Sequence, residues 1–131
     1  MPVEKARILF LDDDAAFLKI VSLRLSAEGY RIKTHTDSAK AIELISQGKV
    51  DVAFVDFKMP EQNGIEVMGR IREFNSTIPL VLLTGHADAA IMEKYKHLNI
   101  NGFFAKLDDL KKLGDLIQVI LRGVDRSSEK R

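Results

Sequence analysis

Three short, uninterrupted apolar runs constrain the fold of this chain more than any other feature. They cover Ile8–Leu11, Val52–Val55 and Leu80–Leu83, and none of them alternates with polar residues. A strand with one wet face alternates apolar and polar residues, whereas a strand buried on both faces reads as a continuous apolar run. The three runs therefore predict the central strands of a parallel sheet that is covered on both faces.

Two further segments are predicted as strands of a different kind. In Tyr30–Thr34, apolar and basic residues alternate, which is typical of a strand at the edge of a sheet. A last short strand is expected at Phe103–Ala105, after a turn-like Asn-Gly pair.

Helical periodicity occupies the segments between these strands. Apolar residues recur there every three or four positions, which places them on one side of a helix. The predicted helices cover Asp14–Glu28, Ser38–Gln47, the segment after Asn63-Gly64 that carries Ile65, Met68 and Ile71, then Ala87–Leu98 and about Asp108–Arg122.

Strand and helix thus alternate five times along the chain. Such alternation predicts right-handed crossovers and a parallel sheet between two layers of helices. A closed eight-stranded barrel needs roughly twice this length. We therefore expect an α/β fold with an open, doubly wound five-stranded parallel sheet in the order 2-1-3-4-5, a flavodoxin-like three-layer sandwich. Residues 1–123 are expected to form this domain, and the polar residues 124–131 a tail or the start of a linker.

Composition excludes several classes of function. Cysteine is absent, which excludes disulfides, thiolate catalysis and cysteine-ligated zinc. A net charge of +1 argues against nucleic-acid binding over the whole surface. No apolar run approaches the ~20 residues of a transmembrane helix, and the first residues do not form a signal peptide. We expect a cytoplasmic protein that binds neither nucleic acid nor a membrane directly.

Polar and charged side chains follow four of the predicted strands. Asp12 and Asp13 follow the first strand, Asp56 ends the third, Thr84 follows the fourth and Lys106 the fifth. In an open parallel sheet these ends meet at one edge, and the first and third strands are neighbours in the predicted order. The three carboxylates are therefore expected to converge, with the threonine and the lysine beside them.

Such a cluster of carboxylates favours a divalent cation and phosphoryl chemistry. Three carboxylates at close range repel one another, and a cation removes the conflict. An oxygen-only site selects Mg²⁺ first and Mn²⁺ second, and Mg²⁺ leaves room for a phosphoryl oxygen. In this hypothesis Asp56 is the nucleophile that forms an aspartyl phosphate. Lys106 and Thr84 bind other oxygens of the transferred group.

These residues resemble those of the receiver domains of two-component response regulators, over roughly residues 5–122. The matching segments are ILFLDDD, VDFKMPEQNG, LLTGHA and FFAK, which occur in the family's order and at its intervals. The resemblance implies that Asp56 is the phosphoacceptor. It also implies metal ligation by Asp13, Asp56 and the backbone carbonyl of Lys58, with Asp12 acting through water.

Other positions near the site are interpreted through the same resemblance. Phe103 matches the aromatic switch residue that turns inward when Thr84 moves toward the phosphate. Lys58 and His86 are expected at the rim, where they tune the lifetime of the phosphate or are simply solvated loop residues. The family usually has proline after the strand-five lysine, often with a cis bond, where this chain has Leu107. A cis bond before a non-proline residue costs ~2.5–4 kcal/mol, so we expect a trans bond and an altered course of the loop.

The resulting hypothesis is a signalling module rather than an enzyme. It accepts a phosphoryl group from a sensor histidine kinase and switches conformation to control an output partner, and it catalyses only its own phosphorylation and dephosphorylation. Because receiver domains dimerise through the face of the fourth helix, fifth strand and fifth helix, this face is a candidate homodimer interface.

Two alternatives stay open. One is a degenerate receiver that acts as a protein-interaction module without phosphorylation, although all of the acidic and acceptor residues are present. The other is a Mg²⁺-dependent aspartyl-phosphate phosphohydrolase. Haloacid-dehalogenase-like enzymes carry a second aspartate two residues after the nucleophile, and this chain has Lys58 at that position.

Overall fold

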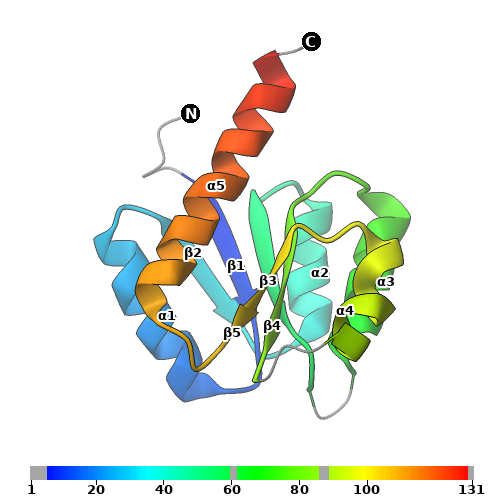
Figure 1. The fold of residues 1–131 in the computed structure, drawn as a ribbon, viewed down its shortest axis with the longest axis horizontal. Coiled ribbons are helices and arrows are strands. Elements are labelled where there is room, and N and C mark those ends of the chain that lie inside the picture. The colour runs from blue at the N-terminus through cyan, green and yellow to red at the C-terminus, as the bar shows by residue number, and fades with distance from the viewer. Residues whose placement is uncertain (1–5, 60–61, 86–88, 130–131) are drawn as a thin grey trace.

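The protein is built around one parallel sheet. The computed structural model describes residues 6–59, 62–85 and 89–129, and for residues 124–129 it describes the backbone alone. The sheet order is β2-β1-β3-β4-β5, so the predicted fold class and strand order are confirmed (Figure 1). The strands are β1 (Arg7–Leu11), β2 (Arg31–His35), β3 (Val52–Asp56), β4 (Leu80–Thr84) and β5 (Gly102–Ala105). The helices are α1 (Ala15–Ala27), α2 (Ser38–Ser46), α3 (Gly64–Phe74), α4 (Ala89–Tyr95) and α5 (Leu110–Glu129), and a 3₁₀ turn (Lys96–Leu98) follows α4.

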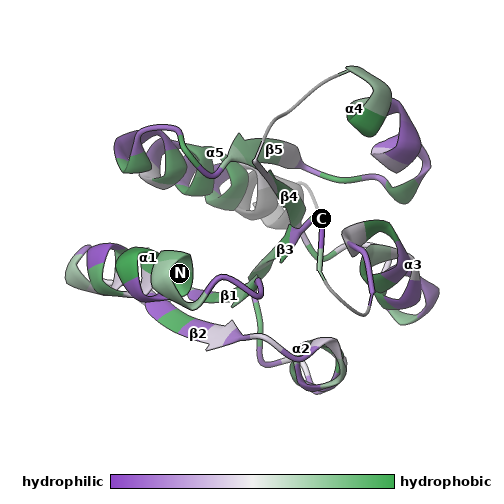
Figure 2. Cartoon of the chain, turned by 90° about the horizontal axis from the view of Figure 1, so that it is seen from below, coloured by the Kyte–Doolittle hydropathy of each residue, from purple (hydrophilic) through white to green (hydrophobic). Residues whose placement is uncertain are grey.

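The helices form a layer on each face of the sheet. Helices α1 and α5 cover one face, and α2, α3 and α4 cover the other (Figure 2). Alternate residues of β1 therefore enter different cores: Phe10 packs with the residues of α1 and α5, and Leu11 with those of α2 and α3. Phe10 also stacks on Phe54 of β3, with ring centroids 4.6 Å apart. Burial on both faces explains why the central strands are continuously apolar.

Side-chain caps fix where the first three helices begin. The carboxylate of Asp14 accepts a hydrogen bond from the backbone N–H of Phe17 at the start of α1. Asp37 caps α2 and Asn63 caps α3 in the same way. A cap satisfies one of the backbone donors that the first turn of a helix leaves free. The chain therefore leaves β1 and β3 in defined directions, which positions the loops at the carboxyl ends of the strands.

The fourth helix differs from its prediction. It ends as an α-helix at Tyr95 rather than at Leu98, and its described part begins at Ala89, whereas residues 87 and 88 lie outside the described residues. Asn99 adopts a left-handed conformation with φ 54°, which ends the helical path. The guanidinium of Arg72 donates to the carbonyl oxygens of Leu98 and Asn99 and so ties this end to α3.

The last helix is longer than its sequence pattern indicates. It begins at Leu110 and continues to Glu129, so the segment predicted as a polar tail is helical as far as that residue. The apolar stripe ends with Ile120, which is buried against the sheet. Beyond that point the helix projects past the body (Figure 1). Propagation of a helix needs only one backbone hydrogen bond per residue, so apolar periodicity underestimates its length. Among the described residues, no helix combines the length and apolarity of a membrane span.

The contrast between two glycines of α3 gives a test of the packing that holds the site. A Cβ on Gly64 would lie 2.5 Å from the backbone oxygen of Asp56, whereas a Cβ on Gly69 meets nothing within 4 Å. We expect Gly64→Ala to lower the free energy of unfolding by about 1–3 kcal/mol, because the backbone must shift. The matched change Gly69→Ala should raise it by roughly 0.5–1 kcal/mol. Urea denaturation measures both, and equal effects would contradict this packing.

Candidate functional site

Three carboxylates gather where β1 and β3 end, at the lower edge of the sheet in Figure 1. Asp12 and Asp13 follow β1, and Asp56 is the last residue of β3. These strands are paired neighbours, and one carboxylate oxygen from each aspartate lies within 4.8 Å of the others. Asp12 and Asp56 are buried and Asp13 is exposed. The structure thus brings together the three aspartates that strand order alone predicted to meet.

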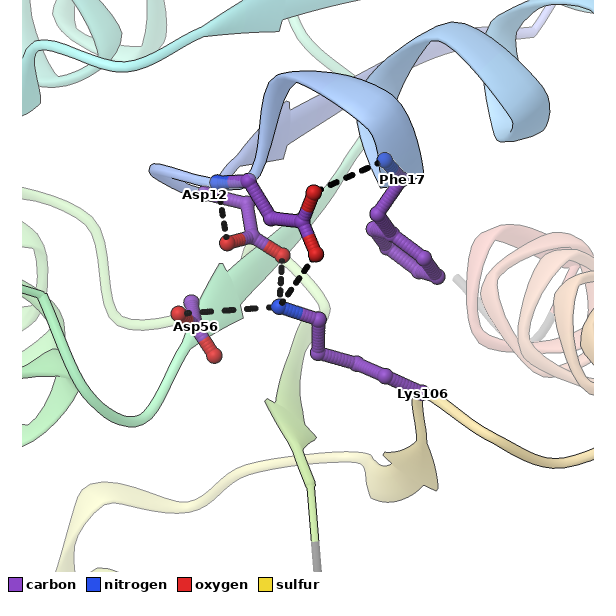
Figure 3. A network of polar contacts seen from close by, with 5 residues as sticks. Asp12, Phe17, Asp56 and Lys106 are labelled. Carbon is purple, nitrogen blue, oxygen red and sulfur yellow. Dashed lines mark hydrogen bonds and ion pairs between the residues drawn. The ribbon is translucent and has the colours of Figure 1, made fainter.

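The ammonium group of Lys106 lies close to the carboxylates of Asp12 and Asp56 (Figure 3). Its Nζ is 2.7 Å from Oδ2 of Asp12 and 3.9 Å from Oδ2 of Asp56. The backbone N–H of Lys106 donates to the carbonyl of Thr84, which fixes where the chain leaves β5. No peptide bond between described residues is cis, so the bond to Leu107 is trans, as expected. The lysine still reaches the aspartates, and Leu107 is 92% exposed.

Burial and charge oppose the ionisation of Asp56. Burial raises its pKa to about 7, with further increases from the charges of Asp12 and Asp13, against a decrease from Lys106. For Lys106, burial lowers the pKa, but Asp12 and Asp56 outweigh that effect and raise it. Two buried carboxylates therefore share one ammonium group, and negative charge remains in excess.

The donor set fits a hard divalent cation. It offers carboxylate oxygens only, and the exposure of Asp13 leaves one side open to water. Mg²⁺ and Mn²⁺ prefer oxygen ligands, and Mg²⁺ keeps several of its waters. A bound cation would also neutralise the excess negative charge around Asp56.

The remaining predicted site residues lie at different depths. Thr84 ends β4, next to β3, and is buried. Lys58 is exposed two residues after Asp56. Phe103 is partly buried against the apolar layer of α2, α3 and α4, and it lines an open groove beside α4. His86 lies outside the described residues.

Sequence reasoning missed three contacts around the site. Asp14 caps α1, and its Oδ2 also lies 3.9 Å from the ammonium of Lys106. The same ammonium lies 5.1 Å from the ring centroid of Phe17, in the first turn of α1. Tyr95 of α4 has its hydroxyl beside Gly64. The first two could have been found from the short distance along the chain between these residues and Asp12.

Comparison with known proteins places the chain in a family. Residues 8–118 match the family described as response regulator receiver domain. The chain is 32% identical over 124 residues to the probable transcriptional regulator ycf27 of Guillardia theta, covering 95% of this chain and 48% of that protein. It is 23% identical over 115 residues to sporulation initiation phosphotransferase F of Bacillus subtilis, covering 88% of this chain and 93% of that protein.

A solved structure shows the same fold. The non-phosphorylated HemR receiver domain from Leptospira biflexa has a TM-score of 0.81 at 24% identity, covering 88% of this chain and 94% of that chain. The chain spans only 19% to 53% of the length of the first transcriptional regulators that it matches. The family match over most of the sequence shows that this chain belongs to the response regulator receiver domain family.

Proposed function

We propose that this receiver domain accepts a phosphoryl group on Asp56 from a sensor histidine kinase, with Mg²⁺ as the cofactor. The observation that carries the proposal is the convergence of Asp12, Asp13 and Asp56, with the ammonium of Lys106 close to Asp12 and Asp56. A carboxylate nucleophile, a cation-binding cluster and a fixed positive charge are the components that phosphoryl transfer needs.

Each residue has a distinct role in this proposal. Asp13, Asp56 and the backbone carbonyl of Lys58 hold the metal, and Asp12 acts through a bound water. When bound, Mg²⁺ neutralises charge on the phosphoryl oxygens. A carboxylate oxygen of Asp56 forms the new bond to phosphorus as the bond to the kinase histidine breaks. Lys106 binds a second phosphoryl oxygen.

Phosphorylation then changes the charge balance of the site and so the conformation. The phosphoryl group adds about −1.5 to −2 charges next to Lys106. The hydroxyl of Thr84 binds a third phosphoryl oxygen, and Phe103 moves inward from its half-buried position as Thr84 shifts. Lys58 and His86 tune how long the phosphate survives. A coupling of ~1–3 kcal/mol is enough to change the affinity of an output partner.

A mass measurement tests the phosphoacceptor. With acetyl phosphate and Mg²⁺, the chain should gain the mass of one phosphoryl group, and the adduct should be stable in acid and labile in base. Asp56→Asn should stay unmodified, because an amide is a poor nucleophile. Intact-mass spectrometry after a brief incubation measures the mass of both proteins.

The same experiment separates the alternatives. Unchanged mass of the folded wild type would favour the degenerate interaction module. Sustained release of phosphate from simple phosphate esters would favour the phosphohydrolase, which turns over free substrate. Lys106→Met serves as a second control, since it should slow phosphorylation of an intact acceptor.

The pKa of Asp56 predicts how pH affects stability. Its folded pKa of about 7 exceeds the ordinary value of 3.8, so the folded state binds more protons than the unfolded state between these values. The free energy of unfolding of the metal-free chain should therefore fall as pH rises from about 4 to about 7, by on the order of 2 kcal/mol. Mg²⁺ should restore stability above about pH 7, because it binds the ionised carboxylate. Thermal unfolding of wild type and Asp56→Asn across this pH range measures the effect, and the variant should lack both responses.

We also propose that the phosphorylated domain forms a homodimer through the face of α4, β5 and α5. This face exposes Met92 and Val119, which are 45% and 62% accessible. Beryllium fluoride with Mg²⁺, a phosphoryl mimic, should raise the sedimentation coefficient of the wild type, and Val119→Asp should prevent the rise by placing a charge in the interface. Leu23→Asp on α1 is the matched control, because Leu23 is 66% exposed on a helix that is not part of this face. An unchanged coefficient in the wild type would contradict dimerisation.

A further inference from the structure

Helix α4 contacts the core through one fully buried side chain, Tyr95, and the partly buried Ile91. Tyr95 is the only residue of α4 that is fully buried, and most of the others are exposed. Its ring packs in the core layer of α2, α3 and α4, tilted against Phe57 with centroids 6.1 Å apart. Any change in the position of Tyr95 therefore changes the position of α4.

The hydroxyl of Tyr95 lies against the backbone that follows the phosphoacceptor. A Cβ built on Gly64 would be 3.0 Å from this hydroxyl and 2.5 Å from the backbone oxygen of Asp56. The hydroxyl and the Asp56 carbonyl thus approach the same side of Gly64, the first residue of α3. The backbone N–H of Gly64 in turn donates to the carbonyl of Phe57, which ties α3 to the end of β3.

This hydroxyl is buried and, within the described residues, has no hydrogen-bond partner. Burial and the charge of Asp56 raise the pKa of Tyr95, whereas the nearby backbone N–H of Ile65 lowers it. This N–H does not meet the geometry of a hydrogen bond to the hydroxyl. The proton of the hydroxyl has no acceptor among the residues that the structure describes. A phenylalanine would fill the same space without the desolvation cost of an unpaired polar group, so the hydroxyl is unfavourable in this form of the protein.

We propose that Tyr95 is a positioning residue that couples α4 to the phosphoacceptor, and that its hydroxyl gains the backbone carbonyl of Asp56 as an acceptor when Asp56 is phosphorylated. The inference rests on the proposed function of Asp56. In that state the end of β3 binds metal and phosphate, and Thr84, which precedes α4, moves toward them. Arg72 holds the other end of this helical segment through Leu98 and Asn99, so α4 pivots about that end.

Tyr95→Phe tests this coupling, and Tyr30→Phe is its matched control. Tyr30 is also buried and without a hydrogen-bond partner among the described residues, but it belongs to the opposite core layer. Both variants keep the aromatic ring. With Mg²⁺ present, Tyr95→Phe should bind beryllium fluoride about threefold to tenfold more weakly than wild type, because it loses a hydrogen bond made only in the bound state. Tyr30→Phe should bind it with wild-type affinity.

A spectroscopic measurement follows the hydroxyl itself. The chain has two tyrosines and no tryptophan, so Tyr95 is the only tyrosine of Tyr30→Phe. Its near-ultraviolet absorption should shift to longer wavelength when Mg²⁺ and beryllium fluoride are added, since the phenol becomes a hydrogen-bond donor. Equal affinity of all three proteins, without a spectral shift, would overturn this inference alone. Failure of the wild type to bind beryllium fluoride would overturn the proposed function and this inference with it.

Discussion

Two buried carboxylates that share one ammonium group are the constraint on which the rest of this structure depends. Asp12 and Asp56 are both buried, and Lys106 is 2.7 Å from the first and 3.9 Å from the second. Burial makes this charge imbalance costly, because low-dielectric surroundings strengthen repulsion as well as attraction. A fold that keeps these carboxylates together thus favours a bound divalent cation. The order of the strands creates the arrangement, since β1 and β3 are neighbours at the centre of the sheet.

Most of the fold could be predicted because its signals are local. Continuous apolar runs identified the buried strands, and the alternation in β2 identified the edge strand, at one end of the sheet order. The aspartate cluster followed from strand order and from the rule that ligands bind beyond the carboxyl ends of parallel strands. These inferences need only the sequence spacing and the topology, and the structure agrees with both.

The features that escaped prediction depend on contacts between distant segments or on weak local signals. The end of α4 depends on the left-handed Asn99 and on Arg72, which comes from α3. The continuation of α5 to Glu129 could not be predicted, because the last residues of this helix show no apolar periodicity. The place of the Tyr95 hydroxyl beside Gly64 arises from the packing of α4 against α3, and an apolar stripe does not distinguish a tyrosine at a site from one in a core.

A titration with Mg²⁺ tests the central claim most directly, because the claim is that separated aspartates form one cation site. Isothermal titration calorimetry at about pH 8, where Asp56 is ionised, should show one Mg²⁺ bound per chain. Asp13→Asn removes a ligand from the exposed side of the cluster, so it should weaken binding at least tenfold without unfolding the domain. Absence of binding to the wild type, or equal binding to both proteins, would contradict the account.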